Sequence, residues 1–191
     1  MRGLSIAFLI ALLAFNGRHT TPHGSRGPGF GDTTAWPASF GFGRPATPAA
    51  IAALDISIQP DGKGLPAGSG NTPTGKAIYL MKCAACHGKT GVEGPAARLV
   101  GPMGDTTKAK TIGNYWPYAT TLFDYTRRAM PYNAPGSLSA DEVYSLTAFL
   151  LCANRVIDSN TVMTAKNLPN VVMPARQFFV PDDRKGGPEI R

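Results

Sequence analysis

Hydrophobic positions recur with a helical period in three stretches of the chain, and all three lie between residues 74 and 152. The first stretch begins at Thr74 and predicts one continuous helix that ends at Cys86. The second, 117–129, opens with Pro117, a residue suited to the first position of a helix. Its apolar face consists of Tyr118, Leu122, Tyr125 and Ala129.

The third stretch has the clearest helix start in the chain. Residues 139–142, Ser-Ala-Asp-Glu, match a capping box, in which the serine and glutamate side chains each bind a backbone N–H of the first turn. Leu138 and Val143 flank it as a hydrophobic staple. The apolar stripe that follows ends near Cys152 and consists of Val143, Leu146, Phe149 and Leu150. The three stretches together predict an all-α domain over 74–152.

The segments on either side of this domain have no sustained apolar period. Residues 18–73 read as a Gly/Pro-rich arm, interrupted within 49–58 by a short helical turn and an extended piece. Residues 153–191 contain four prolines and predict a tail that packs partly on the domain. Gly (22) and Pro (17) make up about a fifth of the 191 residues, which favours much irregular structure.

Residues 1–17 predict a secretory signal peptide. Arg2 supplies a positive charge, and residues 4–15 are apolar except for Ser5. A stretch this short falls below the ~20 residues that span a bilayer. We therefore expect export to the periplasm and removal of the segment, at a cleavage site that the sequence does not define. An uncleaved segment that anchors the protein to the membrane is the alternative.

The formal net charge is +7, but the basic residues are spread along the chain rather than gathered in one block. This distribution argues against nucleic-acid binding, which needs a basic patch or stripe. It is compatible with mild electrostatic attraction to an acidic protein partner.

The sequence Cys-Ala-Ala-Cys-His at 83–87 is the attachment signature of c-type haem. Positions three apart on a helix share a face, so the thiols of Cys83 and Cys86 can both reach the vinyl groups of one porphyrin. His87 can then place a ring nitrogen on the iron. A C-x-x-C pair also occurs in thioredoxin-like redox sites and in zinc sites. The first requires a βαβ pattern and the second requires further ligands nearby, and the sequence shows neither.

The second axial ligand is expected to be a methionine, because no histidine follows His87 and because His19 and His23 lie in the arm. Met130 is the leading candidate, since it falls between the second and third predicted helices. The other methionines are Met81 on the helix of the motif, Met103 in the loop after it, and Met163 and Met173 in the tail. The competing role for each of them is to fill a gap in the core.

Aromatic and basic residues around these ligands are candidates for binding the haem propionates. Trp116 can donate its indole N–H, and Arg127 or Arg128 can neutralise a carboxylate; we assign Trp116 and Arg128 to this role. The competing interpretation is a core aromatic side chain and two solvated charges. Cys152 is an odd thiol, which we expect to be a small buried apolar side chain, with an intermolecular disulfide as the alternative.

These features resemble the class I c-type cytochromes. In that family the first and last helices cross at a small residue and pack aromatic side chains together, as Gly75, Tyr79 and Phe149 match. A Gly-Pro and then a Leu usually follow the motif, and the proline carbonyl accepts the proton of the axial histidine; Gly94-Pro95 and Leu99 match this. The resemblance implies an all-α fold with about three main helices around one covalent haem c, an extended N-terminal arm and a C-terminal tail.

A closer resemblance covers roughly residues 40–180 and is to the cytochrome subunit of bacterial sulfur-compound dehydrogenases. The matching runs are PDGKGLP (60–66), YWPYATTLFDY (115–125), RRAMP (127–131) and NLP with MP (167–174). Those subunits accept electrons from a molybdenum protein that oxidises sulfite or sulfane sulfur. The resemblance implies such a partner, a downstream cytochrome or oxidase as acceptor, and no small-molecule substrate of the cytochrome's own.

The function expected from the sequence is single-electron transfer by a protein that is not itself an enzyme. With His87 and Met130 both bound to iron, no position is open to a substrate or to O₂, and the thioether sulfur raises the reduction potential. One alternative is a haem enzyme or gas-binding sensor with a labile sixth ligand. Another is a structural subunit whose haem only staples the fold.

Overall fold

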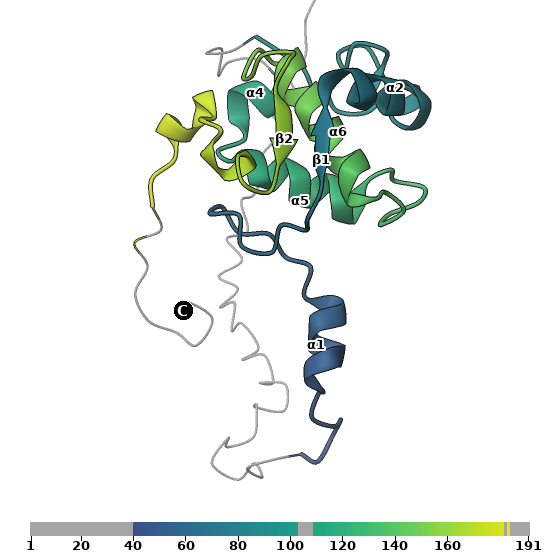
Figure 1. The fold of residues 1–191 in the computed structure, drawn as a ribbon, viewed down its shortest axis with the longest axis vertical. Helices are drawn as coiled ribbons and strands as arrows, with labels where there is room; N and C mark the ends of the chain where they lie inside the picture. The colour runs from purple at the N-terminus through teal and green to yellow at the C-terminus, as the bar shows by residue number, and fades with distance from the viewer. Residues whose placement is uncertain (1–39, 103–108, 182, 184–191) are drawn as a thin grey trace, which may run out of the picture. The chain divides into compact units, whose positions relative to one another are not determined.

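The described part of the chain is mostly helical, as the sequence predicted. The computed structural model describes residues 40–102, 109–181 and 183; the predicted signal segment, the first part of the arm, Met103 and the end of the tail lie outside this range. The elements in chain order are α1 (Pro48–Leu54), β1 (Ser69–Asn71), α2 (Thr72–Lys82), α3 (Ala84–His87), α4 (Ile112–Tyr115), α5 (Ala119–Ala129), α6 (Ala140–Ala153), β2 (Val162–Thr164), and the 3₁₀ helices η2 (Leu168–Asn170) and η3 (Pro174–Phe178) (Figure 1).

Helix α6 is the element on which α2, α5 and both strands pack (Figure 1). At its crossing with α2, a Cβ added to Gly75 would lie 1.8 Å from the carbonyl oxygen of Ser145. The rings of Tyr79 and Phe149 pack beside this crossing with their centroids 5.0 Å apart. Only glycine permits so close an approach, and the expected packing of the first and last helices is confirmed.

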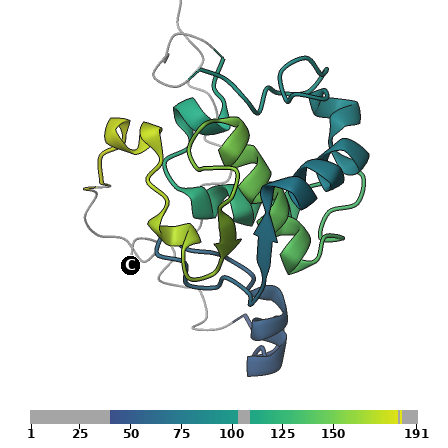
Figure 2. The same ribbon diagram turned by 45° about the horizontal axis from the view of Figure 1, so that its top comes forward.

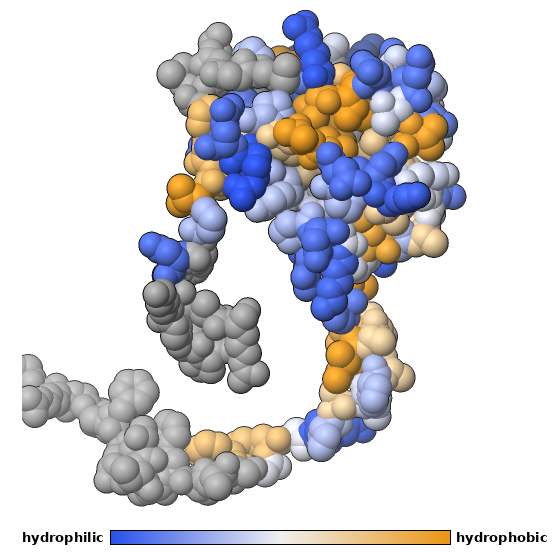
Figure 3. Space-filling model, turned by 60° about the vertical axis from the view of Figure 1, so that its left-hand side comes forward, coloured by the Kyte–Doolittle hydropathy of each residue, from blue (hydrophilic) through white to orange (hydrophobic). Residues whose placement is uncertain are grey.

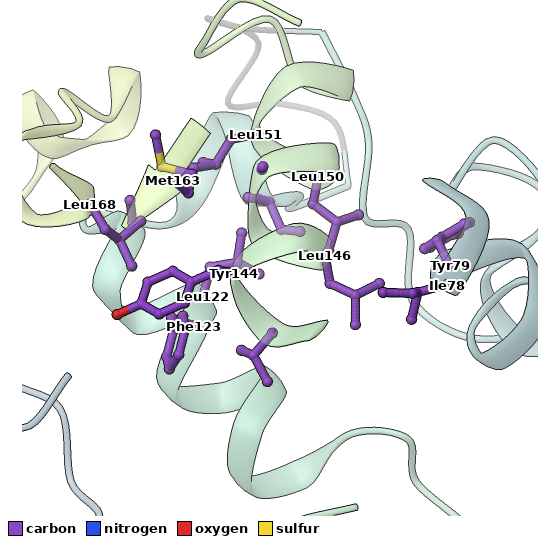
Figure 4. Packing of buried hydrophobic residues seen from close by; sticks show 14 of the residues in the cluster. Ile78, Tyr79, Leu122, Phe123, Tyr144, Leu146, Leu150, Leu151, Met163 and Leu168 are labelled. Atoms are coloured by element: carbon purple, nitrogen blue, oxygen red, sulfur yellow. The ribbon is translucent and has the colours of Figure 1, made fainter. Parts of the chain in front are cut away.

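The hydrophobic core is built mainly from the facing sides of α2, α5 and α6 (Figure 4). Ile78 of α2 and Leu146 of α6 point toward one another. The Phe123 ring of α5 packs on Tyr144 with 4.5 Å between ring centroids. Large side chains such as these bury most of the apolar area that stabilises a small domain.

The start of α6 is the one that the capping box predicted. The hydroxyl of Ser139 accepts a hydrogen bond from the Glu142 N–H at 3.3 Å, and the Glu142 carboxylate accepts one from the Ser139 N–H at 2.9 Å. Leu138 and Val143 are both buried, as expected for a hydrophobic staple.

The single helix expected over 74–86 is interrupted in the structure. Asn71 caps the first turn of α2, and its side chain accepts the Thr74 N–H at 2.9 Å. The helix ends at Lys82, and Cys83 leaves helical geometry (φ −122°, ψ −33°) before α3 begins. Helical hydrogen bonds continue on both sides of this residue, from the Cys83 N–H to Tyr79 and from the His87 N–H to Cys83. The apolar period runs through both helices, so the pattern gave no sign of the break.

The second helix also differs from its prediction. It begins at Ala119 rather than at Pro117, and the short helix α4 precedes it where a loop was expected. Its buried face includes Leu122, Phe123 and Thr126, whereas Tyr125 is 48 % exposed. The predicted face was right at Leu122 and wrong at Tyr125. The face is shifted because two threonines of this helix are buried, and their hydroxyls made these positions look polar in the sequence.

A two-stranded antiparallel sheet joins the segment just before α2 to the segment after α6. Strands β1 and β2 lie side by side (Figures 1 and 2). Gly70 of β1 is paired with Met163 of β2. A Cβ on Gly70 would lie 2.1 Å from the Ser145 nitrogen, so the strand rests directly on α6. The tail also buries Met163, Leu168 and Met173 in the core.

Residues 56–68 of the arm are attached to the helices by hydrogen bonds. The Ile58 N–H donates to Asp124 Oδ1 at 3.2 Å, and the Tyr144 hydroxyl donates to the Pro66 carbonyl at 2.8 Å. Helix α1, capped by Thr47, precedes this segment within the compact unit Ala46–Arg191, and none of its residues is buried. Among the described residues, no helix combines the length and the apolar character needed to cross a bilayer.

Candidate haem site

The two motif cysteines lie where α2 gives way to α3. Cys83 is half-buried against the core, and Cys86 is exposed one helical turn later. Burial is the main reason that the pKa of the Cys83 thiol is raised to about 11. This thiol is therefore protonated at neutral pH.

The ring of His87 is oriented by one hydrogen bond. Its Nδ1 lies 2.8 Å from the carbonyl oxygen of Ala97. A carbonyl only accepts, so Nδ1 carries the proton and Nε2 keeps its lone pair. The expected acceptor was the carbonyl of Pro95, and this expectation was wrong: the chain delivers the acceptor two residues later.

The loop that supplies this acceptor, residues 88–101 (the histidine loop), is held close to α3. The Ala96 N–H donates to the Cys86 carbonyl at 2.9 Å. Gly94 lies so near that an added Cβ would be 2.1 Å from the Cys86 oxygen. At its other end, the Leu99 N–H donates to the Gly91 carbonyl at 2.8 Å, which closes the loop on itself. The backbone thus fixes the position of the Ala97 oxygen.

Asn154, just after α6, joins the histidine loop to the core, and sequence reasoning missed it. Its Oδ1 accepts the N–H groups of Gly101 (3.3 Å) and Gly113 (3.2 Å). Its Nδ2 donates to the carbonyls of Leu99 (3.0 Å) and Leu150 (2.9 Å). The side chain is 1 % exposed. An asparagine directly after the apolar run of the last helix was the signal that could have pointed to it.

Tyr79 braces the start of the same loop. Its hydroxyl donates to the Gly88 carbonyl at 2.8 Å. Burial, followed by the nearby Cys83 and Glu93, raises the pKa of Tyr79 to about 12. The phenol therefore stays protonated, and remains a donor, across the physiological range.

Met130 is the residue that ends α5. It is half-buried and has extended backbone geometry, and its N–H donates to the Thr126 carbonyl at 3.1 Å. Met163 and Met173 are each 2 % exposed within the core cluster, where they fill space, and Met81 is 75 % exposed. Met103, His19 and His23 lie outside the described residues. The segment 130–138 that follows α5 is called the methionine loop below.

The two residues assigned to propionates have other contacts in the protein. Trp116 is half-buried and packs edge-on against Tyr125, with 5.6 Å between ring centroids. Arg128 forms an ion pair with Asp124 one turn earlier on α5. Asp124 also accepts the Ile58 N–H, so Arg128 is tied to the point where the arm is anchored. The propionate roles stay predictions.

The residues present fit a c-type haem better than the competing sites. Two thiols one turn apart, a histidine with Nε2 free and a half-buried methionine supply the donors that such a haem needs. Over residues 40–102 and 109–183, apart from 182, no group of three or more His, Cys, Asp or Glu could hold a zinc ion. The strands that the structure describes form one antiparallel pair, without the βαβ unit that a thioredoxin-like site requires.

Comparison with known proteins points in the same direction. Residues 70–150 match the family model of the cbb3-type cytochrome c oxidase, subunit III. The structure is similar to a chain in the crystal structure of the sulfane dehydrogenase SoxCD from Paracoccus pantotrophus, with a TM-score of 0.68 and 43% sequence identity. The match covers 76% of this chain and 74% of that chain. A comparison with curated proteins gives no match.

Proposed function

Since the chain belongs to the class I c-type cytochromes, we propose that it is a periplasmic mono-haem electron carrier that serves a molybdenum-containing sulfur-compound dehydrogenase. Haem-based electron transfer follows from the family itself. The proposal adds the ligands, the partner and the compartment. Cys83 and Cys86 hold one haem covalently, and His87 and Met130 are its axial ligands.

The hydrogen bond from His87 Nδ1 to the Ala97 carbonyl is the observation that carries the proposal. It fixes the tautomer that leaves Nε2 for iron, and it makes the imidazole a stronger electron donor. A bound haem supplies a one-electron redox centre at this position. The chain's own residues hold it in a fixed orientation, and a fixed geometry needs little rearrangement between the two oxidation states.

Whether Met130 binds the iron distinguishes an electron carrier from the alternative of a haem enzyme or gas sensor. A thioether on the second face leaves no position open to substrate or gas. We expect the reduced protein to bind no carbon monoxide and the oxidised protein to show a near-infrared band from sulfur bound to iron. Rapid carbon monoxide binding by the untreated protein would favour the alternative.

The ligand assignment is tested by replacing two methionines separately. Met130→Ala removes the proposed ligand, so the near-infrared band should disappear and the reduction potential should fall. Met81→Ala is the matched control, because Met81 precedes the motif on α2 and is 75 % exposed. An unchanged spectrum in Met130→Ala would show that another residue is the ligand.

The partner is proposed from the similarity to the sulfane dehydrogenase structure. The test is to mix the oxidised cytochrome with the molybdenum-containing subunit of the same organism and its sulfur substrate, and to follow haem reduction. Reduction within the turnover time supports the assignment, and no reduction at any subunit concentration contradicts it. A downstream cytochrome or oxidase then removes the electron.

The periplasmic location is proposed from residues 1–17 and from the covalent haem motif. The test is to fractionate cells that express the full chain and to measure the mass of the haem-containing product. A shortened chain in the periplasmic fraction supports a cleaved signal peptide. A full-length chain in the membrane fraction supports the uncleaved anchor.

A further inference from the structure

Helix α1 has the composition of a buried helix but is exposed along its whole length. Its seven residues, Pro48–Leu54, carry no charge, and none is buried. Ile51 is 54 % exposed and Leu54 is 85 % exposed. Figure 3 shows a largely hydrophobic surface on this helix. A helix that is apolar all round is normally buried, and one this short is marginal by itself in water. Its exposed apolar side chains are therefore available for contact with a partner.

The arm holds α1 within a short reach of the folded domain. Ile58 is anchored through its N–H to Asp124, four residues after the helix ends. Four extended residues span at most about 14 Å. At Gly64 (φ +90°) an added Cβ would lie 2.2 Å from the Ser57 oxygen, so the anchored segment folds back tightly on itself. A partner that binds α1 is thereby kept near the helices that carry the haem ligands.

The chemistry of α1 favours a protein groove over a lipid surface. Helices that lie on membranes have a polar face rich in Lys and Arg beside the apolar one. Such a face is missing from Pro48–Leu54, where every side chain is apolar. A groove lined by apolar side chains can surround a helix of this kind, with anchors at the i and i+3 positions. Ile51 and Leu54 have that spacing.

The similarity to the sulfane dehydrogenase structure includes this helix. The match covers 76% of the 191 residues, which is about 145 residues. A continuous match of about 145 residues within a chain of 191 begins no later than Thr47, and its span then includes α1. The arm is thus shared with a chain that was crystallised as part of a dehydrogenase, which favours the dehydrogenase over a second copy of this chain as the partner.

We infer that α1 is a docking helix, which inserts Ile51 and Leu54 into an apolar groove on the molybdenum-containing dehydrogenase subunit. The inference rests on the proposed function, because it names the surface through which the proposed partner is bound. In this arrangement two parts of the cytochrome have different roles. Helix α1 supplies binding energy for the partner, and the edge of the haem stays available to receive the electron. Two buried side chains of this size contribute enough binding free energy that replacing both by polar ones should lower the affinity for the subunit at least about tenfold.

The test compares two glutamine variants, because glutamine is polar but favours helices. The double variant Ile51→Gln/Leu54→Gln alters α1, and Val172→Gln is the matched control, since Val172 is also 85 % exposed. Calorimetry measures the Kd of each haem-loaded full chain for the molybdenum-containing subunit of the same organism. We expect at least a tenfold higher Kd for the double variant and no change for the control, with equal haem content and reduction potential.

The outcomes separate this inference from the function on which it rests. If the wild-type chain binds the subunit and accepts its electrons while the double variant binds equally well, the docking role is overturned and the proposed function stands. If the double variant changes only the self-association of the cytochrome, α1 is covered by a second copy and the inference is again overturned. If the wild-type chain neither binds nor is reduced, both proposals fail.

Discussion

The histidine loop follows α3 and the methionine loop follows α5, and the protein holds these two loops in different ways. The histidine loop is tied to α3 by backbone hydrogen bonds and to the core by the buried side chain of Asn154. Among the residues that the structure describes, the hydrogen bonds of the methionine loop are all local: Met130 donates to Thr126, Ala134 to Pro131 and Ser137 to Ala134. Tyr132 within this loop is 85 % exposed. Around Gly136 an added Cβ would meet nothing within 4 Å.

This difference assigns different tasks to the two ligands. The histidine side is fixed before any ligand binds, so its geometry is set by the fold. The methionine side has room to adjust, so the proposed bond of Met130 to iron would depend more on local turns. Changes that loosen the histidine loop should remove this contrast between the two loops.

The largest expected effect is that of Asn154→Leu. The change leaves the N–H groups of Gly101 and Gly113 without a partner, and each buried unpaired group costs about 1 to 3 kcal/mol. The carbonyls of Leu99 and Leu150 also lose the asparagine side chain, but each keeps a backbone N–H donor. Allowing for relaxation, we expect the free energy of unfolding to fall by about 4 kcal/mol. Denaturant unfolding of the haem-loaded protein measures it.

Asn133→Leu is the control for this prediction, because Asn133 is an exposed asparagine of the methionine loop. Its effect should stay within about 0.5 kcal/mol. Similar losses in both variants would mean that the two loops are equally coupled to the core, and the comparison would be wrong.

Two glycine substitutions, one in each loop, should have effects of intermediate size on the free energy of unfolding. In Gly94→Ala the new Cβ meets the Cys86 oxygen at 2.1 Å, which forces the histidine loop away from α3 and should cost about 2 to 3 kcal/mol. Gly136→Ala has free space but a positive φ of 73°, so it should cost about 1 kcal/mol. Thermal or denaturant unfolding measures which of the two variants loses more stability. A larger loss in Gly136→Ala than in Gly94→Ala would contradict the conclusion that the histidine loop is the more rigid of the two.

The smallest expected effect is a pH dependence within the histidine loop. The hydrogen bond from the Thr90 hydroxyl is the main cause that lowers the pKa of Glu93 from 4.5 to about 2. Because the folded pKa is depressed, the stabilisation is complete above pH 4.5 and is lost as the pH falls toward 2. Glu93→Gln should flatten the stability profile in this window, as measured by unfolding at several pH values. If stability still falls with pH in the variant between pH 4.5 and 2, the pH dependence comes from another carboxylate.

The parts of the molecule that could be predicted from the sequence are those set by local chemistry. The capping box placed the start of α6 correctly, because Ser139 and Glu142 act within one turn. Gly75, Tyr79 and Phe149 meet as the family resemblance implied. The match to the family model of a cytochrome c oxidase subunit and the similarity to the sulfane dehydrogenase structure support the haem-binding function that the motif at 83–87 indicated.

The parts that could not be predicted depend on contacts between distant residues. The choice of Ala97 over Pro95 as the acceptor for His87 follows from how the histidine loop folds against α3. Asn154 reaches carbonyl and amide groups more than forty positions away in the chain, which no local pattern shows. The pairing of Arg128 with Asp124 is an exception, since an acid and a base four positions apart on a helix are a local pattern that the sequence does contain.

The pairing of β1 with β2 bears on the order in which the chain folds. About 90 residues separate Asn71 from Val162, and closing so long a loop costs entropy before the strands gain any contact. Contacts of this kind form late, whereas helices close their hydrogen bonds locally and early. An enzyme that attaches haem can therefore reach the thiols of Cys83 and Cys86 before the two strands pair and while the fold is still open.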